Sequence, residues 1–246
     1  MKVFLIAATI LFLPSMLSLR TKTVDQEQRS NQKVLTVEDF VKGQIDRGSG
    51  RESLTLMIQI NQRLPPYKFH LIPDLTVSDS PGSDNPSHHV GWIEISVGES
   101  ISTLQKIDVR TKSGSSSFTK SFQAEDVNFD GFLDIAVLYD FGAKWSILNY
   151  WLFDKRTGRF ITSPLTQELK RISHSQMELD NNTKEIRFTH YVGVCPQNES
   201  YKILNGHLVL MEKEERICTM KGQKVFVKKR INGRMKLMKI RFIKNE

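Results

Sequence analysis

The sequence has only two cysteines among its 246 residues, Cys195 and Cys218. A metal centre built on thiolates, or a catalytic thiol, needs histidine or further cysteine at a defined spacing, and neither cysteine has such neighbours. In an oxidising compartment the simplest account of two cysteines is one disulfide across a pair of strands. Two buried free thiols are the alternative.

The common catalytic signatures are also missing. The chain has no G-x-S-x-G nucleophile elbow, no H-E-x-x-H zinc motif and no glycine loop that would cradle a phosphate. His88 and His89 lie together in a Ser/Pro-rich stretch, where a ligand role is not expected. We therefore predict no catalytic residues, and an enzyme is the weakest of the function classes considered.

Long hydrophobic runs are confined to the N-terminus. After a short positive start at Met1-Lys2, the run Val3–Leu19 is almost wholly apolar, with Pro14 inside it. This run is short for a membrane span and is broken by a proline, so residues 1–19 are predicted to be a signal peptide. No cysteine follows it to accept a lipid. We expect a periplasmic or secreted protein, and an uncleaved anchor is the alternative.

Acidic residues are nearly missing from the C-terminal stretch. The whole chain has 35 Lys/Arg and 27 Asp/Glu, but residues 221–246 hold ten of the basic and one of the acidic residues, which leaves 25 basic and 26 acidic elsewhere. We predict that this basic segment is a β-hairpin with one solvated face. The functional alternatives are binding to anionic lipid headgroups or to a cell-surface polymer, and export makes nucleic acid the least expected partner.

Short strands account for most of the remaining pattern. Apolar segments alternate with turn residues about every 8–12 positions, and Asn205-Gly206 and Asn232-Gly233 have the signature of type I′ hairpin turns. The expected strands are 54–60, 67–72, 92–97, 104–109, 135–138, 146–153, 159–161, 177–179, 185–191, 201–204, 207–211, 224–231 and 234–242. Short helices are expected at Thr36–Ile45 and Pro164–Ile172.

The predicted fold is therefore all-β and mainly antiparallel. A sandwich, a barrel or a propeller-like arrangement would each suit so many short strands, and no helix–strand alternation supports a parallel sheet. We expect a flexible arm at 20–35 and one β domain over 36–246. The long polar segment Thr76–His89 is expected to be a loop or insertion.

One stretch carries recognisable chemistry, AEDVNFDGFLDIAVL at Ala124–Leu138. Calcium takes six to eight oxygen ligands, and a short loop can supply them from positions 1, 3, 5, 7 and 9 around a glycine at position 6. Here Gly131 is that glycine, where the chain must turn with positive φ. The predicted Ca²⁺ ligands are the side chains of Asp126, Asn128, Asp130 and Asp134 and the backbone carbonyl of Phe132.

The loop differs from a regulatory EF-hand in two ways. Its twelfth position is Val137 where an EF-hand has a glutamate. After Asp134 the apolar run Ile135–Leu138 predicts a buried strand and not an exiting helix. We therefore expect a structural calcium clip at the entry to a central strand. The alternative is an Asp/Asn/Gly turn between two strands without metal.

The motif DVNFDGFLDIAVL resembles the FG-GAP-type calcium loop of integrin-like β-propellers. The longer span Phe122–Phe160 is similar to a family of bacterial exported proteins with a D-x-N-x-D-G-x-x-D loop, an apolar strand, a Gly-containing loop and an aromatic strand ending in D-x-x-T-G-R-F. The matching parts here are Asp126–Asp134, Ile135–Leu138, Phe141-Gly142-Ala143, Tyr150–Phe153 and Asp154–Phe160. A studied member is a calcium-binding periplasmic immunity protein that inhibits a lysozyme-like effector, with a fold similar to periplasmic lysozyme inhibitors. That member is a lipoprotein, whereas this chain has no lipidation cysteine.

The resemblance supports the calcium ligands residue by residue, and it implies by analogy a protein that inhibits a lysozyme-like peptidoglycan hydrolase. Such an inhibitor would place a protruding Tyr or His between the two carboxylates of a glycosidase cleft. Tyr191 and His190 near the predicted disulfide, and Tyr139 after the calcium loop, are candidates among which the sequence does not choose. The alternative function is an FG-GAP-like cell-surface adhesion or interaction module that uses the basic C-terminal face.

Overall fold

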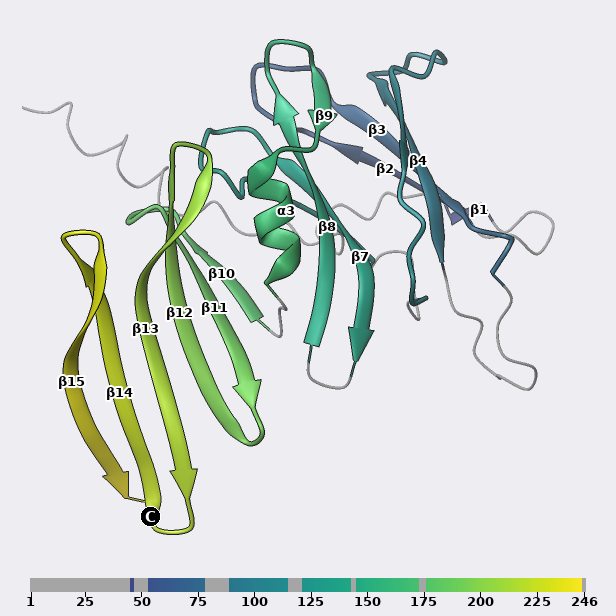
Figure 1. Cartoon of the computed structure of the whole chain (residues 1–246). Coiled ribbons are helices and arrows are strands. Elements are labelled where there is room, and N and C mark those ends of the chain that lie inside the picture. Colours follow the sequence, from purple (N-terminus) through teal and green to yellow (C-terminus); the bar gives the residue numbers. More distant parts are fainter. Residues whose placement is uncertain are drawn as a thin grey trace, which may run out of the picture. The chain divides into compact units, whose positions relative to one another are not determined.

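The computed structural model describes residues 45–46, 53–77, 89–114, 121–142, 145–172 and 176–244. These residues form antiparallel strands and one short helix (Figure 1). The all-β prediction is confirmed. The expected signal peptide, the arm at 20–35 and most of the helix expected at Thr36–Ile45 lie outside the described residues, as does most of Thr76–His89.

The first sheet has five strands in the order β1-β2-β3-β4-β5. Their bounds are β1 Ile45–Asp46, β2 Ser53–Ile58, β3 Tyr67–Pro73, β4 Val90–Val97 and β5 Gln105–Asp108. Leu54, Leu56 and Ile58 of β2 are all buried, and the residues between them are more exposed. Alternation in the sequence therefore decides which face of this sheet enters the core.

The second sheet has four strands in the order β6-β7-β8-β9. Their bounds are β6 Phe122–Glu125, β7 Asp134–Gly142, β8 Trp145–Asp154 and β9 Arg159–Ile161. Strand β7 is buried on both faces: Ile135 and Val137 pack with the first sheet, and Ala136 packs into a second core. Because neither face meets water there, Asp134 is followed in β7 by a continuous apolar run, Ile135–Leu138.

The helix α3, Pro164–Arg171, follows the second sheet. Ser163 caps it: the Ser163 hydroxyl accepts from the backbone N–H of Thr166, and the Thr166 hydroxyl accepts from the backbone N–H of Ser163. This reciprocal capping box satisfies two backbone donors that a helix start leaves unpaired. Leu165 and Leu169 are buried, as the predicted apolar face requires.

The third sheet has six strands in the order β10-β11-β12-β13-β14-β15. Their bounds are β10 Gln176–Asp180, β11 Glu185–Val192, β12 Cys195–Leu204, β13 His207–Thr219, β14 Gly222–Ile231 and β15 Arg234–Lys244. Both predicted Asn-Gly turns are confirmed, with φ of 52° and 76° at Asn205 and Gly206 and of 50° and 77° at Asn232 and Gly233. Strands β12 and β13 are longer than predicted.

The four-stranded sheet is the middle layer of the described residues. One face packs against the five-stranded sheet around side chains such as Phe69, Phe122 and Phe160. The other face packs against α3 and the first strands of the six-stranded sheet, with Tyr150, Leu169 and Phe188 in that core. Packed sheets, and not propeller blades, are thus the arrangement found. Within the described ranges, no helix is long and apolar enough to span a bilayer.

Candidate metal centre

The predicted calcium loop joins β6 to β7 and is anchored to the segment that follows β2. The chain turns with positive φ at Phe129 (60°) and Gly131 (88°), and the latter is the position where the loop pattern requires a glycine. The N–H of Leu133 donates to the carbonyl of Ile60 (2.9 Å), and the Asn61 side chain donates to the carbonyl of Gly131 (2.7 Å). The loop is therefore fixed by the first sheet as well as by its own strands.

The side-chain oxygens of the loop accept hydrogen bonds from the loop's own backbone. The two Asp126 carboxylate oxygens accept from the N–H groups of Asp130 (2.9 Å) and Gly131 (2.8 Å). Asn128 Oδ1 accepts from the N–H of Asp130 (3.0 Å), and Asp130 Oδ1 accepts from the N–H of Phe132 (3.0 Å). Hydrogen bonds of this kind, from backbone N–H groups to nearby Asp and Asn side chains, bend the loop into successive tight turns.

Asp134 is the most deeply placed of the four acidic and amide residues, with no exposed surface. The pKa of Asp134 is raised to about 8, and burial is the largest cause. The negative charges of Asp130 and Asp126 raise this pKa further, whereas the hydrogen bonds from the N–H groups of Phe153 (2.8 Å) and Val127 (3.1 Å) lower it. Burial also raises the pKa of Asp126. Two of the three loop carboxylates, Asp126 and Asp134, thus lie where water solvates them poorly, whereas Asp130 is exposed.

These residues fit a calcium ion by the chemistry of their donors. All five predicted ligands offer oxygen, the donor that hard cations such as Ca²⁺ prefer, and a cation would favour the ionised form of the buried carboxylates. In the part of the chain that the structure describes, no group of three or more His, Cys, Asp or Glu could hold a metal ion. The carboxylates of Asp126, Asp130 and Asp134 thus do not form a metal-holding cluster by themselves, and the calcium site stays a prediction from the loop pattern.

A further buried acid, Glu125, was not singled out from the sequence. It is 9% exposed, and burial raises its pKa to about 7. Glu125 stands opposite Asp134 in the register of β6 and β7. Its burial comes from the packing of β6 in the middle sheet, and the only sequence signal was an acid placed directly before the loop.

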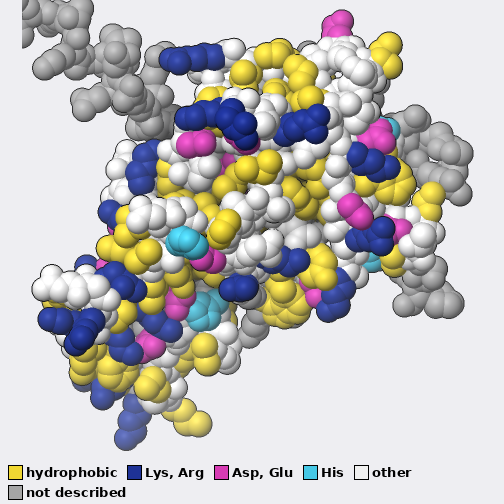
Figure 2. Space-filling view, turned by 45° about the horizontal axis from the view of Figure 1, so that its top comes forward, with side chains coloured by type: hydrophobic (Ala, Val, Ile, Leu, Met, Phe, Trp, Pro, Cys, Tyr) yellow, Lys and Arg dark blue, Asp and Glu magenta, His cyan; other side chains and the backbone are white. Residues whose placement is uncertain are grey.

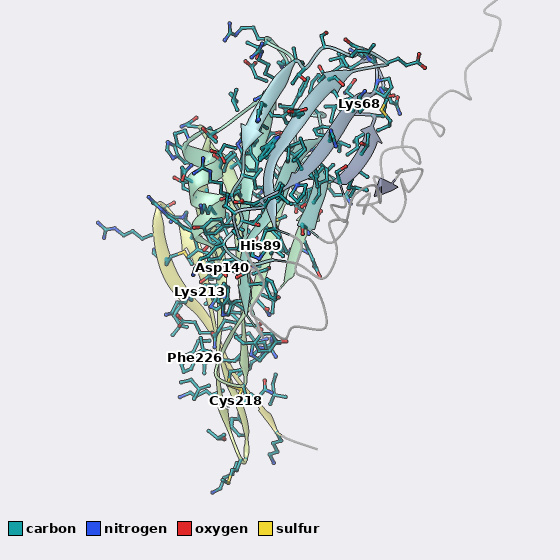
Figure 3. All side chains as sticks on the ribbon, turned by 90° about the vertical axis from the view of Figure 1, so that its right-hand side faces the viewer. Lys68, His89, Asp140, Lys213, Cys218 and Phe226 are labelled. Atoms are coloured by element: carbon teal, nitrogen blue, oxygen red, sulfur yellow. A yellow bond between two sulfur atoms is a disulfide. The ribbon has the colours of Figure 1, made fainter. Side chains whose placement is uncertain are left out.

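The predicted disulfide is present between Cys195 and Cys218. It joins the start of β12 to the end of β13, and the turns β11–β12 and β13–β14 lie at the same end of the sheet (Figure 1). The Gln197 side chain adds a second link, since it donates to the carbonyl of Arg216 (2.8 Å) and accepts from its N–H (3.0 Å). Figure 3 shows Lys213, Phe226 and Cys218 following one another along the sheet toward this end.

Large apolar side chains are exposed beside this disulfide. Their exposed fractions are 45% for Tyr191, 63% for Val192, 79% for Val194 and 100% for Met220. We call these four residues the apolar tip. Water-exposed apolar side chains gathered at one point are typical of a binding surface.

The fold has a known counterpart. The chain is similar to a structure described as "Structure of a Xanthomonas Type IV Secretion System related protein", with a TM-score of 0.51 and 16% sequence identity over 76% of this chain and 99% of that chain. At this identity the likeness concerns the fold alone. Neither a protein-family model nor a curated protein matches the sequence.

The structure places the three candidate plug residues differently. Tyr191 belongs to the apolar tip, and His190 before it is half-buried. Tyr139 lies on β7, where the Lys170 ammonium of α3 sits 4.1 Å from the centre of its ring. Tyr191 is therefore the most exposed of the three, and it comes from the part of the sheet that the disulfide holds.

Proposed function

We propose that this chain is an exported calcium-binding β protein that acts as a binding and inhibitor module, and that its target is a lysozyme-like peptidoglycan hydrolase. The observation that carries the proposal is the apolar tip. A target cleft can take up such side chains with little loss of backbone entropy, because the disulfide and the Gln197–Arg216 hydrogen bonds already fix the strands beside them.

Export is supported by the disulfide and by the apolar N-terminal run. Disulfides persist in oxidising compartments and are rare where thiols are kept reduced. The Xanthomonas protein of similar fold is described as related to a type IV secretion system. A secretion-related role for this chain, such as immunity to a delivered effector, agrees with that description.

Inhibition would follow from the geometry of a glycosidase cleft. The two catalytic carboxyl groups of such enzymes stand about 5–9.5 Å apart, which is wide enough to admit one side chain. The Tyr191 hydroxyl could donate a hydrogen bond to one carboxylate, while its ring and the neighbouring valines displace water. Binding of the tip would then block the substrate without any chemistry by the inhibitor.

The inhibitor role is tested by turnover of peptidoglycan by a panel of lysozyme-like hydrolases. The wild-type chain should slow at least one of them, and Tyr191→Ala should need about tenfold more protein for the same effect, a loss typical of an interface anchor. Phe141→Ala is the matched control, since Phe141 is 44% exposed but lies on β7. A panel left untouched by the wild type would count against the proposal.

Calcium binding is tested separately by thermal unfolding with calcium and with a chelator. Ligand that binds only the folded state stabilises it by about 2.7 kcal/mol at a hundredfold excess over Kd, so calcium should raise the melting temperature by several degrees. Asp130→Ala should remove this shift. Asp180→Ala is the control, because Asp180 accepts similar turn hydrogen bonds outside the loop. An equal shift in Asp130→Ala would exclude the site.

A further inference from the structure

Strand β15 is an open edge of the six-stranded sheet. Within the described residues it pairs with β14 on one side and has no strand on the other. All of its residues except Met235 are exposed. A long edge strand of this kind presents a row of backbone N–H and C=O groups that another strand could pair with.

The two faces of β15 have different chemistry, as its register with β14 shows. Lys239 and Arg241 stand opposite Val227 and Val225, whereas Ile240 stands opposite Phe226. Cross-strand partners share a face and successive residues alternate, so from Arg234 to Phe242 the cations of β15 lie on one side and its apolar side chains on the other. A bulge at Met238 preserves this division. The last two residues reverse it, with Ile243 on the cationic side and Lys244 on the apolar side. The cationic face has Arg234, Lys236, Lys239 and Arg241; the apolar face has Leu237, Ile240 and Phe242.

Within the described part of the chain, most charges on the cationic face have no ion pair, and the side chains of the apolar face are half-exposed to water. Of the cationic face only Arg241 has an ion pair there, with Glu214 at 2.7 Å, and β15 contains no acidic residue. The apolar side chains are 52% exposed for Leu237, 51% for Ile240 and 54% for Phe242. In Figure 2 hydrophobic and basic side chains lie close together at the lower left of the molecule.

The chemistry of these two faces limits which kind of partner could bind to the β15 edge. A second copy of the chain paired through β15 would bring cations against cations, which is destabilising. A bilayer is one plane, and it would meet either the cationic face or the apolar face of the edge but not both. A strand lying beside β15 contacts both faces at once, because its own side chains alternate in the same way.

We propose that the β15 edge binds an extended protein segment in which acidic and apolar residues alternate. Backbone hydrogen bonds to the open edge would supply affinity, as in other cases of strand addition. The acidic side chains would meet Lys236 and Lys239, and the apolar ones would meet Ile240 and Phe242. This surface is additional to the apolar tip, and binding here does not depend on hydrolase inhibition.

The probe is a fluorescent peptide of alternating glutamate and valine, about as long as β15, titrated with the full chain and followed by anisotropy. It should bind, and binding should weaken as salt is added. Two further peptides carry N-methyl groups on all glutamates or on all valines. In a strand beside β15, the N–H groups of only one of these two sets point at β15. N-methylation of that set removes the donors and should abolish binding, whereas N-methylation of the other set should leave binding intact. Equal behaviour of the two would overturn strand addition.

The protein variants test the cations. Replacing Arg234, Lys236 and Lys239 by glutamine should weaken peptide binding about tenfold, as expected for three exposed charge pairs. The matched control replaces three exposed cations elsewhere, Arg63, Lys155 and Arg159, by glutamine and should bind as the wild type does. If both triple variants lose binding equally, the effect is net charge, and the proposal fails.

Vesicles of phosphatidylcholine with phosphatidylglycerol test the remaining occupant. The proposal expects peptide binding whether or not vesicles are added. Retention on these vesicles that is lost in the Arg234/Lys236/Lys239 variant, without binding of the peptide, would assign the edge to anionic lipid and overturn the proposal. If the chain binds neither the peptide nor the vesicles, the proposal is also overturned. The cations of β15 would then serve only to prevent two copies of the chain from pairing through this edge.

Discussion

Asp140 on β7 fastens the segment after β5 to the middle sheet. Its carboxylate accepts hydrogen bonds from the Lys112 ammonium (2.7 Å) and from the Ser113 hydroxyl. The N–H groups of Lys112 and Ser113 also donate to the carbonyl of Tyr139, at 2.7 and 3.2 Å. The hydrogen bonds from Lys112 and Ser113 lower the pKa of Asp140. The Asp140 side chain and the Tyr139 carbonyl together thus hold a segment that belongs to no strand.

This contact predicts a pH-dependent contribution to stability. A carboxyl whose pKa is lower in the folded protein stabilises it above the unfolded value of about 3.9, and this stabilisation is lost as pH falls through the folded pKa. Asp140→Asn should therefore lower the melting temperature at neutral pH, and the difference from wild type should shrink toward about pH 2. Thermal unfolding across this pH range measures it. Asp108→Asn, an exposed acid paired with Arg110, is the control; a difference that stays constant with pH would contradict the prediction.

The backbone turn of the loop Asp126–Asp134 could be predicted because it is local: Gly131 stands where the pattern requires positive φ, and the chain turns there with φ of 88°. Calcium binding by the five oxygen donors stays a prediction. The burial of Glu125 and the exposure of Tyr191 could not be predicted. Each depends on packing between segments that lie far apart in the sequence.

Helix α3 depends strongly on its N-terminal cap, because the helix is short. An eight-residue helix is marginal by itself and needs both its cap and its buried face. Ser163→Ala should destabilise the protein by about 1 kcal/mol, because the N–H of Thr166 loses its acceptor. Urea unfolding measures the loss. Ser163→Asn should recover most of it, and Thr162→Ala, at an exposed neighbouring hydroxyl, should have little effect.

The disulfide should stabilise the six-stranded sheet at the end that carries the apolar tip. The two cysteines are 23 positions apart, and closing a loop of this size in the unfolded chain stabilises the folded state by about 3 kcal/mol. Replacing both cysteines by alanine should lower the free energy of unfolding by about this amount. Reduction of the wild type should reproduce the change, whereas reduction of the variant should do nothing. An unchanged unfolding midpoint after reduction of the wild type would be the contrary result.

Hairpin turns were predictable in a way that strand lengths were not. Asn-Gly pairs specify their own backbone conformation, so the turns at 205–206 and 232–233 follow from two residues each. The extra residues of β12 and β13 are mostly polar and give no hydrophobic alternation. They pair through cross-strand contacts such as Lys213–Glu199 (3.0 Å), which appear only once the two strands are aligned.

Two hydrophobic cores share the four-stranded sheet, so we expect them to unfold in one cooperative transition. Phe69→Ala, in the core with the five-stranded sheet, and Phe188→Ala, in the core with α3, should each cost about 3–5 kcal/mol. Because both cores use β7 and β8, each variant should shift one common transition. Urea unfolding followed by both tryptophan fluorescence and circular dichroism tests this. Non-coincident curves would contradict it, and the exposed Phe141→Ala should change little.

The order of the layers could not be predicted from the sequence. Alternation in β2 shows that one face is buried, but it does not say which sheet covers that face. The continuous apolar run at Ile135–Val137 did indicate a central strand, because only a strand covered on both sides avoids water throughout. The choice between packed sheets and propeller blades depended on contacts such as Phe69 with Phe122, whose ring centres are 5.4 Å apart.

In all three sheets the strands are ordered in space as they are along the chain. Each sheet is therefore completed within its own continuous segment, and no pairing has to wait for a distant part of the sequence. Contacts between near neighbours in sequence form fast, because little loop-closure entropy opposes them. The sheets can therefore form in succession along the chain, and we expect their docking through the two cores to be the slow step of folding.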